Sequence, residues 1–171
     1  MSRTQTKAAM FKQIQSWIKD ELDLETQYLQ ASPQIPQDAV VVTLEPDSQG
    51  QPRVASILFL PNDDGEIEHF ELLQFYLEGP VKIPEASRET YLKFAASANQ
   101  VIPVGSFSVT EEGELVFKYV IPVSKKNGLD KEEFLEIYLL WMFTLDSVSG
   151  LVEEVLAGDK TLEEAQEELV S

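Results

Sequence analysis

The stretch SFSVTEEGELVFKYVIPV, residues 106–123, decides the class of the fold because its pattern predicts two strands joined by a tight turn. Apolar and polar residues alternate along both halves, which is the period of a β-strand. Glu111, Glu112 and Gly113 interrupt the alternation, and Gly113 can supply a positive φ to the turn. We therefore expect an antiparallel hairpin at this place in the chain.

The sequence around the hairpin predicts three earlier strands and four helices. The strands are expected at residues 39–44, 53–60 and 67–77, between proline- and glycine-rich turns. Apolar residues at helical spacing predict helices over residues 5–30 and 85–101. A long helix follows the hairpin, with Asp130 as its N-cap, Glu133 three positions on and Gly158 as its stop. A short helix is expected in the tail.

The resulting order is α-β-β-β-α-β-β-α plus a C-terminal helix. Connections of hairpin length predict antiparallel pairing, so the expected class is α+β, with a five-stranded antiparallel sheet and helices packed on it. A chain of 171 residues is long enough for one domain with a substantial core. We expect a single domain over residues 1–158, with residues 159–171 as a helical extension of that domain.

One segment carries a resemblance to a known family. Residues 91–123, YLKFAASANQVIPVGSFSVTEEGELVFKYVIPV, place Asn99 late in a helix, Gly105 before the first strand and Gly113 in the turn. This segment, together with the element order over residues 5–157, resembles the YbjN family, whose domain has the fold of type III secretion chaperones. The resemblance implies an α+β domain that pairs as a homodimer, with a chaperone-like or regulatory role and no catalytic residues to carry over.

Composition narrows the possible partners and compartments. The formal net charge is −17, from 30 acidic and 13 basic residues. Nucleic acids and anionic membranes are themselves densely negative, so we expect neither as a partner. The absence of cysteine excludes disulfides and thiolate chemistry, and it fits a reducing cytoplasm. The most apolar run, residues 134–145, is shorter than the about 20 residues that cross a bilayer.

Few residues are candidates for catalysis. His69 is the only histidine, and a metal site would pair it with Glu71 on one face of a strand. The alternative, which we favour, is an exposed polar residue on the sheet. Asp146 follows a long apolar run and is either a buried carboxylate or a surface residue. No nucleophile elbow, Walker A or dinucleotide motif is present. We therefore expect no enzyme activity, no cofactor and no metal.

The long helix after the hairpin is apolar on two sides. At 100° per residue, one side carries a stripe that we assign to the core: Phe134, Tyr138, Trp141, Leu145, Val148 and Val152. The opposite side carries the candidate interface residues: Leu135, Leu139, Leu140, Met142 and Phe143.

Two covers are possible for that second side. Either the first helix or the tail stripe of Leu162, Ala165 and Leu169 lies across it, or a second copy of the chain or a client protein does. We expect a non-catalytic protein-binding domain, chaperone-like or regulatory, that acts as a homodimer. A small-ligand-binding protein, or an enzyme whose site is assembled from scattered residues, is the alternative.

Overall fold

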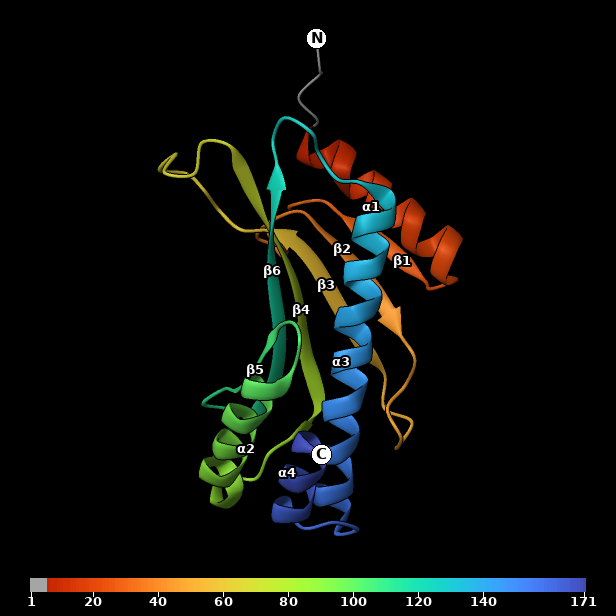
Figure 1. The fold of residues 1–171 in the computed structure, drawn as a ribbon. Helices are drawn as coiled ribbons and strands as arrows, with labels where there is room; N and C mark the ends of the chain where they lie inside the picture. The colour runs from red at the N-terminus through yellow and green to blue at the C-terminus, as the bar shows by residue number, and fades with distance from the viewer. Residues whose placement is uncertain (1–5) are drawn as a thin grey trace. The chain divides into compact units, whose positions relative to one another are not determined.

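The computed structural model describes residues 6–171, with the backbone alone at positions 80 and 81. The helices are α1 (Lys7–Leu22), α2 (Arg88–Val101), α3 (Lys131–Ala157) and α4 (Leu162–Val170), and a 3-10 turn, η1 (Glu85–Ser87), precedes α2. The strands are β1 (Thr26–Leu29), β2 (Ala39–Leu44), β3 (Arg53–Phe59), β4 (Phe70–Lys82), β5 (Ser106–Val109) and β6 (Glu114–Ser124). Figure 1 shows these elements in order along the chain.

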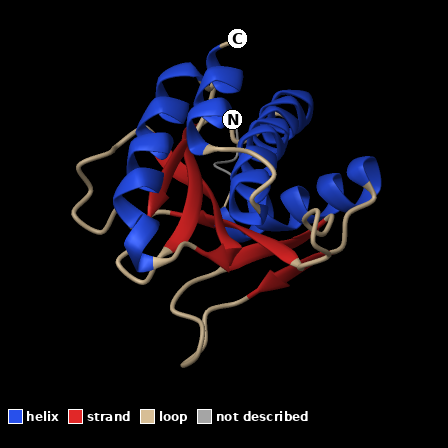
Figure 2. Ribbon diagram, turned by 90° about the horizontal axis from the view of Figure 1, so that it is seen from below, coloured by secondary structure: helices blue, strands red, loops and turns tan. Residues whose placement is uncertain are grey.

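The six strands form one antiparallel sheet in the order β1-β2-β3-β4-β6-β5, and the helices pack against it (Figures 1 and 2). The predicted α+β class is therefore confirmed. The predicted count of five strands is wrong, because β1 is a sixth strand. It pairs antiparallel with β2, with Thr26 opposite Val42 and Tyr28 opposite Val40.

Strand β1 was not predicted because the predicted first helix extends over its residues. The helix expected over residues 5–30 ends at Leu22, where Asp23 takes a left-handed conformation with φ 53°. A left-handed residue closes a helix because its backbone can no longer continue the helical hydrogen bonds. Thr26 and Tyr28, both favourable in strands, then run along β2 as an edge strand.

The described chain forms two compact units, each with its own packing. The first takes in the described residues up to Leu44, Val54–Tyr76 and Val120–Ile137. The second comprises Glu45–Arg53, Leu77–Tyr119 and Tyr138–Ser171, and β4, β6 and α3 pass from one unit to the other. In the first unit, Phe11 of α1 is buried and stacks on Tyr28, with ring centroids 5.4 Å apart.

The hairpin that opened the sequence lies in the second unit as β5 and β6. Gly113 has a φ of 84°, as the turn requires, and a Cβ atom there would lie 2.5 Å from the carbonyl oxygen of Ile83. The Asn99 side chain ties α2 to the hairpin: its Nδ2 donates to the Phe107 carbonyl at 2.9 Å, and its Oδ1 accepts from the Phe107 amide at 2.7 Å. The role of Asn99 is therefore to hold α2 against β5.

Candidate functional site

Helix α3 is the element that carries the candidate site, and its ends were predicted correctly. The Asp130 carboxylate accepts a hydrogen bond from the Glu133 amide at 3.0 Å, and Gly158 ends the helix with a φ of 81°. The core stripe is confirmed, because none of its side chains is more than 4% exposed: Phe134, Tyr138, Trp141, Leu145, Val148 and Val152. In the second unit Trp141 stacks on Phe117, with centroids 5.3 Å apart and rings 4° from parallel.

The opposite side of α3 carries the residues that sequence reasoning offered as an interface. We call this set the α3 patch: Leu135, Leu139, Leu140, Met142 and Phe143. Phe143 is 70% exposed, Leu139 48% and Leu140 39%, while Leu135 and Met142 are half-buried. A phenyl ring that is mostly in contact with water is an unusual use of a large apolar side chain.

The tail helix does not cover the α3 patch. Ala165 of α4 is fully buried, and the Gln166 side chain lies 3.5 Å from the Ser97 hydroxyl of α2. Helix α4 therefore packs beside α2. Phe143 itself is 70% exposed.

A hollow of about 460 Å³ lies farther along α3, between its second half and α4. We call it the α3–α4 hollow, and its lining residues are Ser147, Gly150, Leu151, Glu154, Glu168 and Leu169. A Cβ atom built on Gly150 would meet nothing within 4 Å. The missing side chain of Gly150 thus keeps this part of the helix surface open.

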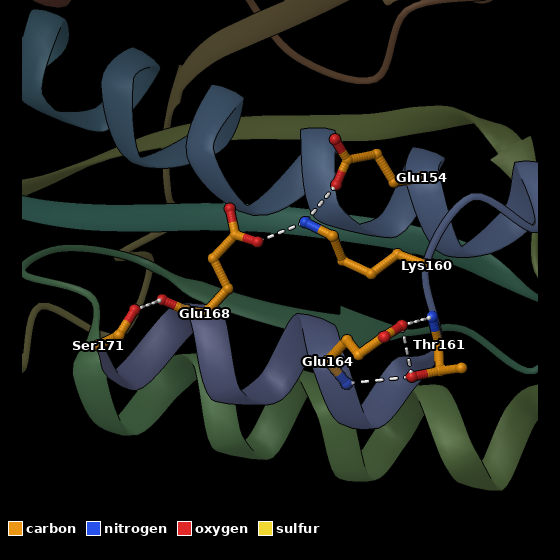
Figure 3. A network of polar contacts seen from close by, with 6 residues as sticks. All are labelled: Glu154, Lys160, Thr161, Glu164, Glu168 and Ser171. Carbon is orange, nitrogen blue, oxygen red and sulfur yellow. Dashed lines mark hydrogen bonds and ion pairs between the residues drawn. The ribbon is translucent and has the colours of Figure 1, made fainter.

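The acidic residues around the hollow are held by one lysine (Figure 3). The Lys160 ammonium group lies 2.8 Å from Glu154 and also contacts Glu168. Hydrogen bonds to these two carboxylates raise the pKa of Lys160 to about 12. Next to it, Thr161 and Glu164 form a reciprocal N-terminal cap of α4, which fixes where that helix begins.

Asp146 is a surface carboxylate with a buried partner. Arg53 Nη1 donates to Asp146 Oδ1 at 2.6 Å, and Arg53 Nε donates to the Glu45 carbonyl at 2.7 Å. The Arg53 side chain is 9% exposed and that of Asp146 57%. The carboxylate therefore serves to neutralise the buried guanidinium group.

A small cavity beside Arg53 contains a polar atom that sequence reasoning missed. Asp47 is 8% exposed, and its Oδ1 accepts hydrogen bonds from the amides of Gln49 and Gln51 at 3.0 and 2.7 Å. Its Oδ2 is buried and has no hydrogen-bond partner among the described residues. The cavity that Asp47 and Arg53 help to line has a volume of about 30 Å³. This space suits one water molecule and is too small for an organic ligand.

His69 lies on the surface. Its side chain is 80% exposed, and Glu68 Oε2 lies 4.0 Å from its Nε2. Glu71 instead pairs with the ammonium groups of Lys7 at 3.1 Å and Lys125 at 3.8 Å. Within residues 6–171 no three histidine, aspartate or glutamate side chains gather as metal ligands would.

No family model matches the chain, and no curated protein matches it in sequence. The resemblance to the YbjN family stays a prediction from residues 91–123 and from the order of the elements.

Proposed function

We propose that this chain is a non-catalytic protein-binding domain, chaperone-like or regulatory, and that it acts as a homodimer through the α3 patch. The observation that carries the proposal is the 70% exposure of Phe143 beside Leu139 and Leu140, on a helix whose other side is fully buried. Burying the rest of Phe143 would contribute about 1.5–2 kcal/mol, and burying the exposed parts of Leu139 and Leu140 would contribute roughly 1 kcal/mol each. Association is the simplest way for the chain to gain that free energy.

Contact with a lipid bilayer is the other way in which the α3 patch could be buried. By length and composition α3 could cross a membrane, and only 39% of its most apolar window is buried. The core helix of a water-soluble protein passes the same test. Three features favour a protein cover: the buried aromatic stripe on the inner side, the ion pair between Asp146 and Arg53 in mid-helix, and a net charge of −17, which anionic lipids repel.

The remaining features agree with binding rather than chemistry. His69 stands on the surface, and the cavity at Asp47 has room for about one water molecule. The acidic charge disfavours DNA and RNA, because the chain has few cations with which to displace their counterions. The resemblance to the YbjN family adds the expectation of paired copies, and the absence of cysteine fits a location in the cytoplasm.

The test is the mass of the protein in solution, measured by light scattering after gel filtration. We expect a dimer for the natural chain and a monomer for Phe143→Glu, because a carboxylate in the interface would lose its hydration. The thermal unfolding of Phe143→Glu, followed by circular dichroism, should match that of the natural chain at low concentration, since Phe143 is exposed.

A matched pair of leucines controls for the general effect of surface charge. Leu140 on α3 is 39% exposed and Leu92 on α2 is 38% exposed. Leu140→Glu should dissociate the dimer, whereas Leu92→Glu should leave it intact. A monomeric natural chain, or equal effects of the two leucine variants, contradicts the proposal. A monomer that co-sediments with neutral lipid vesicles would assign the α3 patch to a membrane.

A further inference from the structure

The α3 patch and the α3–α4 hollow lie in line on the same side of one helix. Phe143, Ser147 and Gly150 are spaced at i, i+4 and i+7, so they form one stripe along α3. Phe143 projects into solvent, and Gly150, about 10.5 Å farther along the axis, leaves the surface open. Along this stripe, a large exposed side chain is therefore followed by a position with no side chain.

We propose that two copies pair their α3 helices antiparallel about a two-fold axis beside Ser147, so that Phe143 of each copy enters the α3–α4 hollow of the other and lies over Gly150. This inference rests on the proposed homodimer and gives it a register. In an antiparallel pair related by a two-fold axis, a residue on one side of the axis faces the partner's residue that lies equally far on the other side. An axis midway between positions 143 and 150 therefore sets Phe143 of each copy opposite Gly150 of the other copy.

The hollow supplies contact area that the α3 patch lacks. A stable dimer buries about 800 Å² on each partner. A phenyl ring contributes at most about 250 Å² and the patch has only five side chains, two of them already half-buried. Seating Phe143 in the hollow brings Leu169 of α4 into the interface as well, because Leu169 lines it. The partner's α4 thereby enlarges the buried surface.

The charges along this stripe are partly compensated within one copy, which lessens the repulsion from a second copy of the acidic chain. Asp146 is paired with Arg53, and Glu154 and Glu168 share Lys160. The Ser147 hydroxyl donates to the Phe143 carbonyl at 2.9 Å, so it needs no partner at the axis. The remaining net charge of −17 still repels a second copy, so added salt should tighten the dimer. A basic client protein would show the opposite salt dependence.

Filling the hollow is the decisive experiment. Gly150→Leu should raise the dissociation constant of the dimer at least about 100-fold, because it blocks two symmetric phenyl sites. Its melting temperature as a monomer should not fall, since leucine favours the helix more than glycine does. Gly150→Ala is the graded comparison: its methyl group meets open space within one copy and fills less of the hollow than leucine does, so it should raise the dissociation constant by less than about tenfold.

A double variant tests the register itself. In the proposed pairing, Phe143→Ala combined with Gly150→Phe again sets a large residue opposite a small one. We expect dimerisation to be weakened by either single change and recovered in the double variant to within about tenfold of the natural chain. If positions 143 and 150 do not contact each other across the dimer, the double variant should lose the sum of the two dimerisation free energies lost in the single variants.

The absence of cysteine in the natural chain allows a direct check by cross-linking. Ser147→Cys should be joined into a covalent dimer by a short bismaleimide, because the two copies meet at this position, while Ser16→Cys on the exposed side of α1 should not. A natural chain that is dimeric, with Gly150→Leu equally dimeric or Ser147→Cys not cross-linked, overturns this register and leaves the proposed function standing. A monomeric natural chain overturns both.

Discussion

The two sides of α3 are built from similar residues and meet different surroundings. The inner stripe includes Trp141, fully buried, and the outer α3 patch includes Phe143, 70% exposed only two positions later. Both are large aromatic residues in the same helix, so hydrophobicity does not distinguish them. What distinguishes them is the 100° turn between successive residues, which directs one ring to the sheet and the other to water. The inner side contributes to folding, and the outer side is free to contribute to association.

The largest effect is expected from truncating the inner side. Trp141→Ala should lower the free energy of unfolding by about 3–5 kcal/mol, because it leaves a cavity next to the stacked ring of Phe117. Phe143→Ala should change that free energy by less than about 0.5 kcal/mol in the monomer. Urea unfolding at a concentration where the protein is monomeric measures both values.

Should Trp141→Ala fail to fold, Trp141→Phe should fold with an intermediate loss, because it keeps a ring against Phe117. At high protein concentration, Phe143→Ala should have a lower apparent melting temperature than the natural chain, because the variant loses the stabilisation that dimerisation provides. Equal losses for Trp141→Ala and Phe143→Ala in the monomer would mean that Phe143 belongs to the core.

The two sides of α3 could be predicted from the sequence because they depend on the spacing of residues close together in the chain. Helical spacing separates Trp141 from Phe143, and the helix ends are marked by Asp130 and Gly158. Strand β1 could not be read in this way. Its apolar positions also fit a helix, and the stop at Asp23 depends on a left-handed conformation for which aspartate is only one of several candidates.

The surroundings of the site were less predictable, because they are made by distant residues. The five residues of the α3 patch followed from helical spacing, but the hollow beside them depends on where α4 packs. A lone glycine inside a long apolar helix, Gly150, was the one local signal of an opening. The partner of Asp146 is Arg53, 93 positions away, and no sequence pattern links the two.

The ion pair between Arg53 and Asp146 joins a buried group to the outer side of α3. Asp146→Ala should cost about 1–2 kcal/mol of unfolding free energy, because the buried guanidinium loses a charged hydrogen bond. Arg53→Met should cost less, since the exposed carboxylate of Asp146 can be hydrated. Denaturant unfolding of both variants in the Phe143→Glu background removes any contribution from association.

The double variant completes that measurement. Once Arg53→Met is present, adding Asp146→Ala should change the unfolding free energy by no more than about 0.5 kcal/mol. Full additivity of the two losses would show that the pair contributes nothing and that Asp146 acts through another contact.

The smallest effect on folding is expected at Lys160, on the rim of the outer side. Hydrogen bonds to Glu154 and Glu168 raise its pKa above the ordinary value of 10.5 to about 12, so the stabilisation is fully present below pH 10.5 and is lost as the pH rises through about 12. Lys160→Met should therefore lower the melting temperature of the monomer by about 2 °C or less, by the same amount from pH 7 to pH 9.

Association should respond more strongly, because the variant leaves two uncompensated carboxylates beside the hollow in each copy. We expect the dimer of Lys160→Met to weaken most at low salt and to recover as salt screens the carboxylates. Light scattering across a salt series measures this, and a dimer indifferent to Lys160→Met at every salt concentration would place the hollow outside the interface.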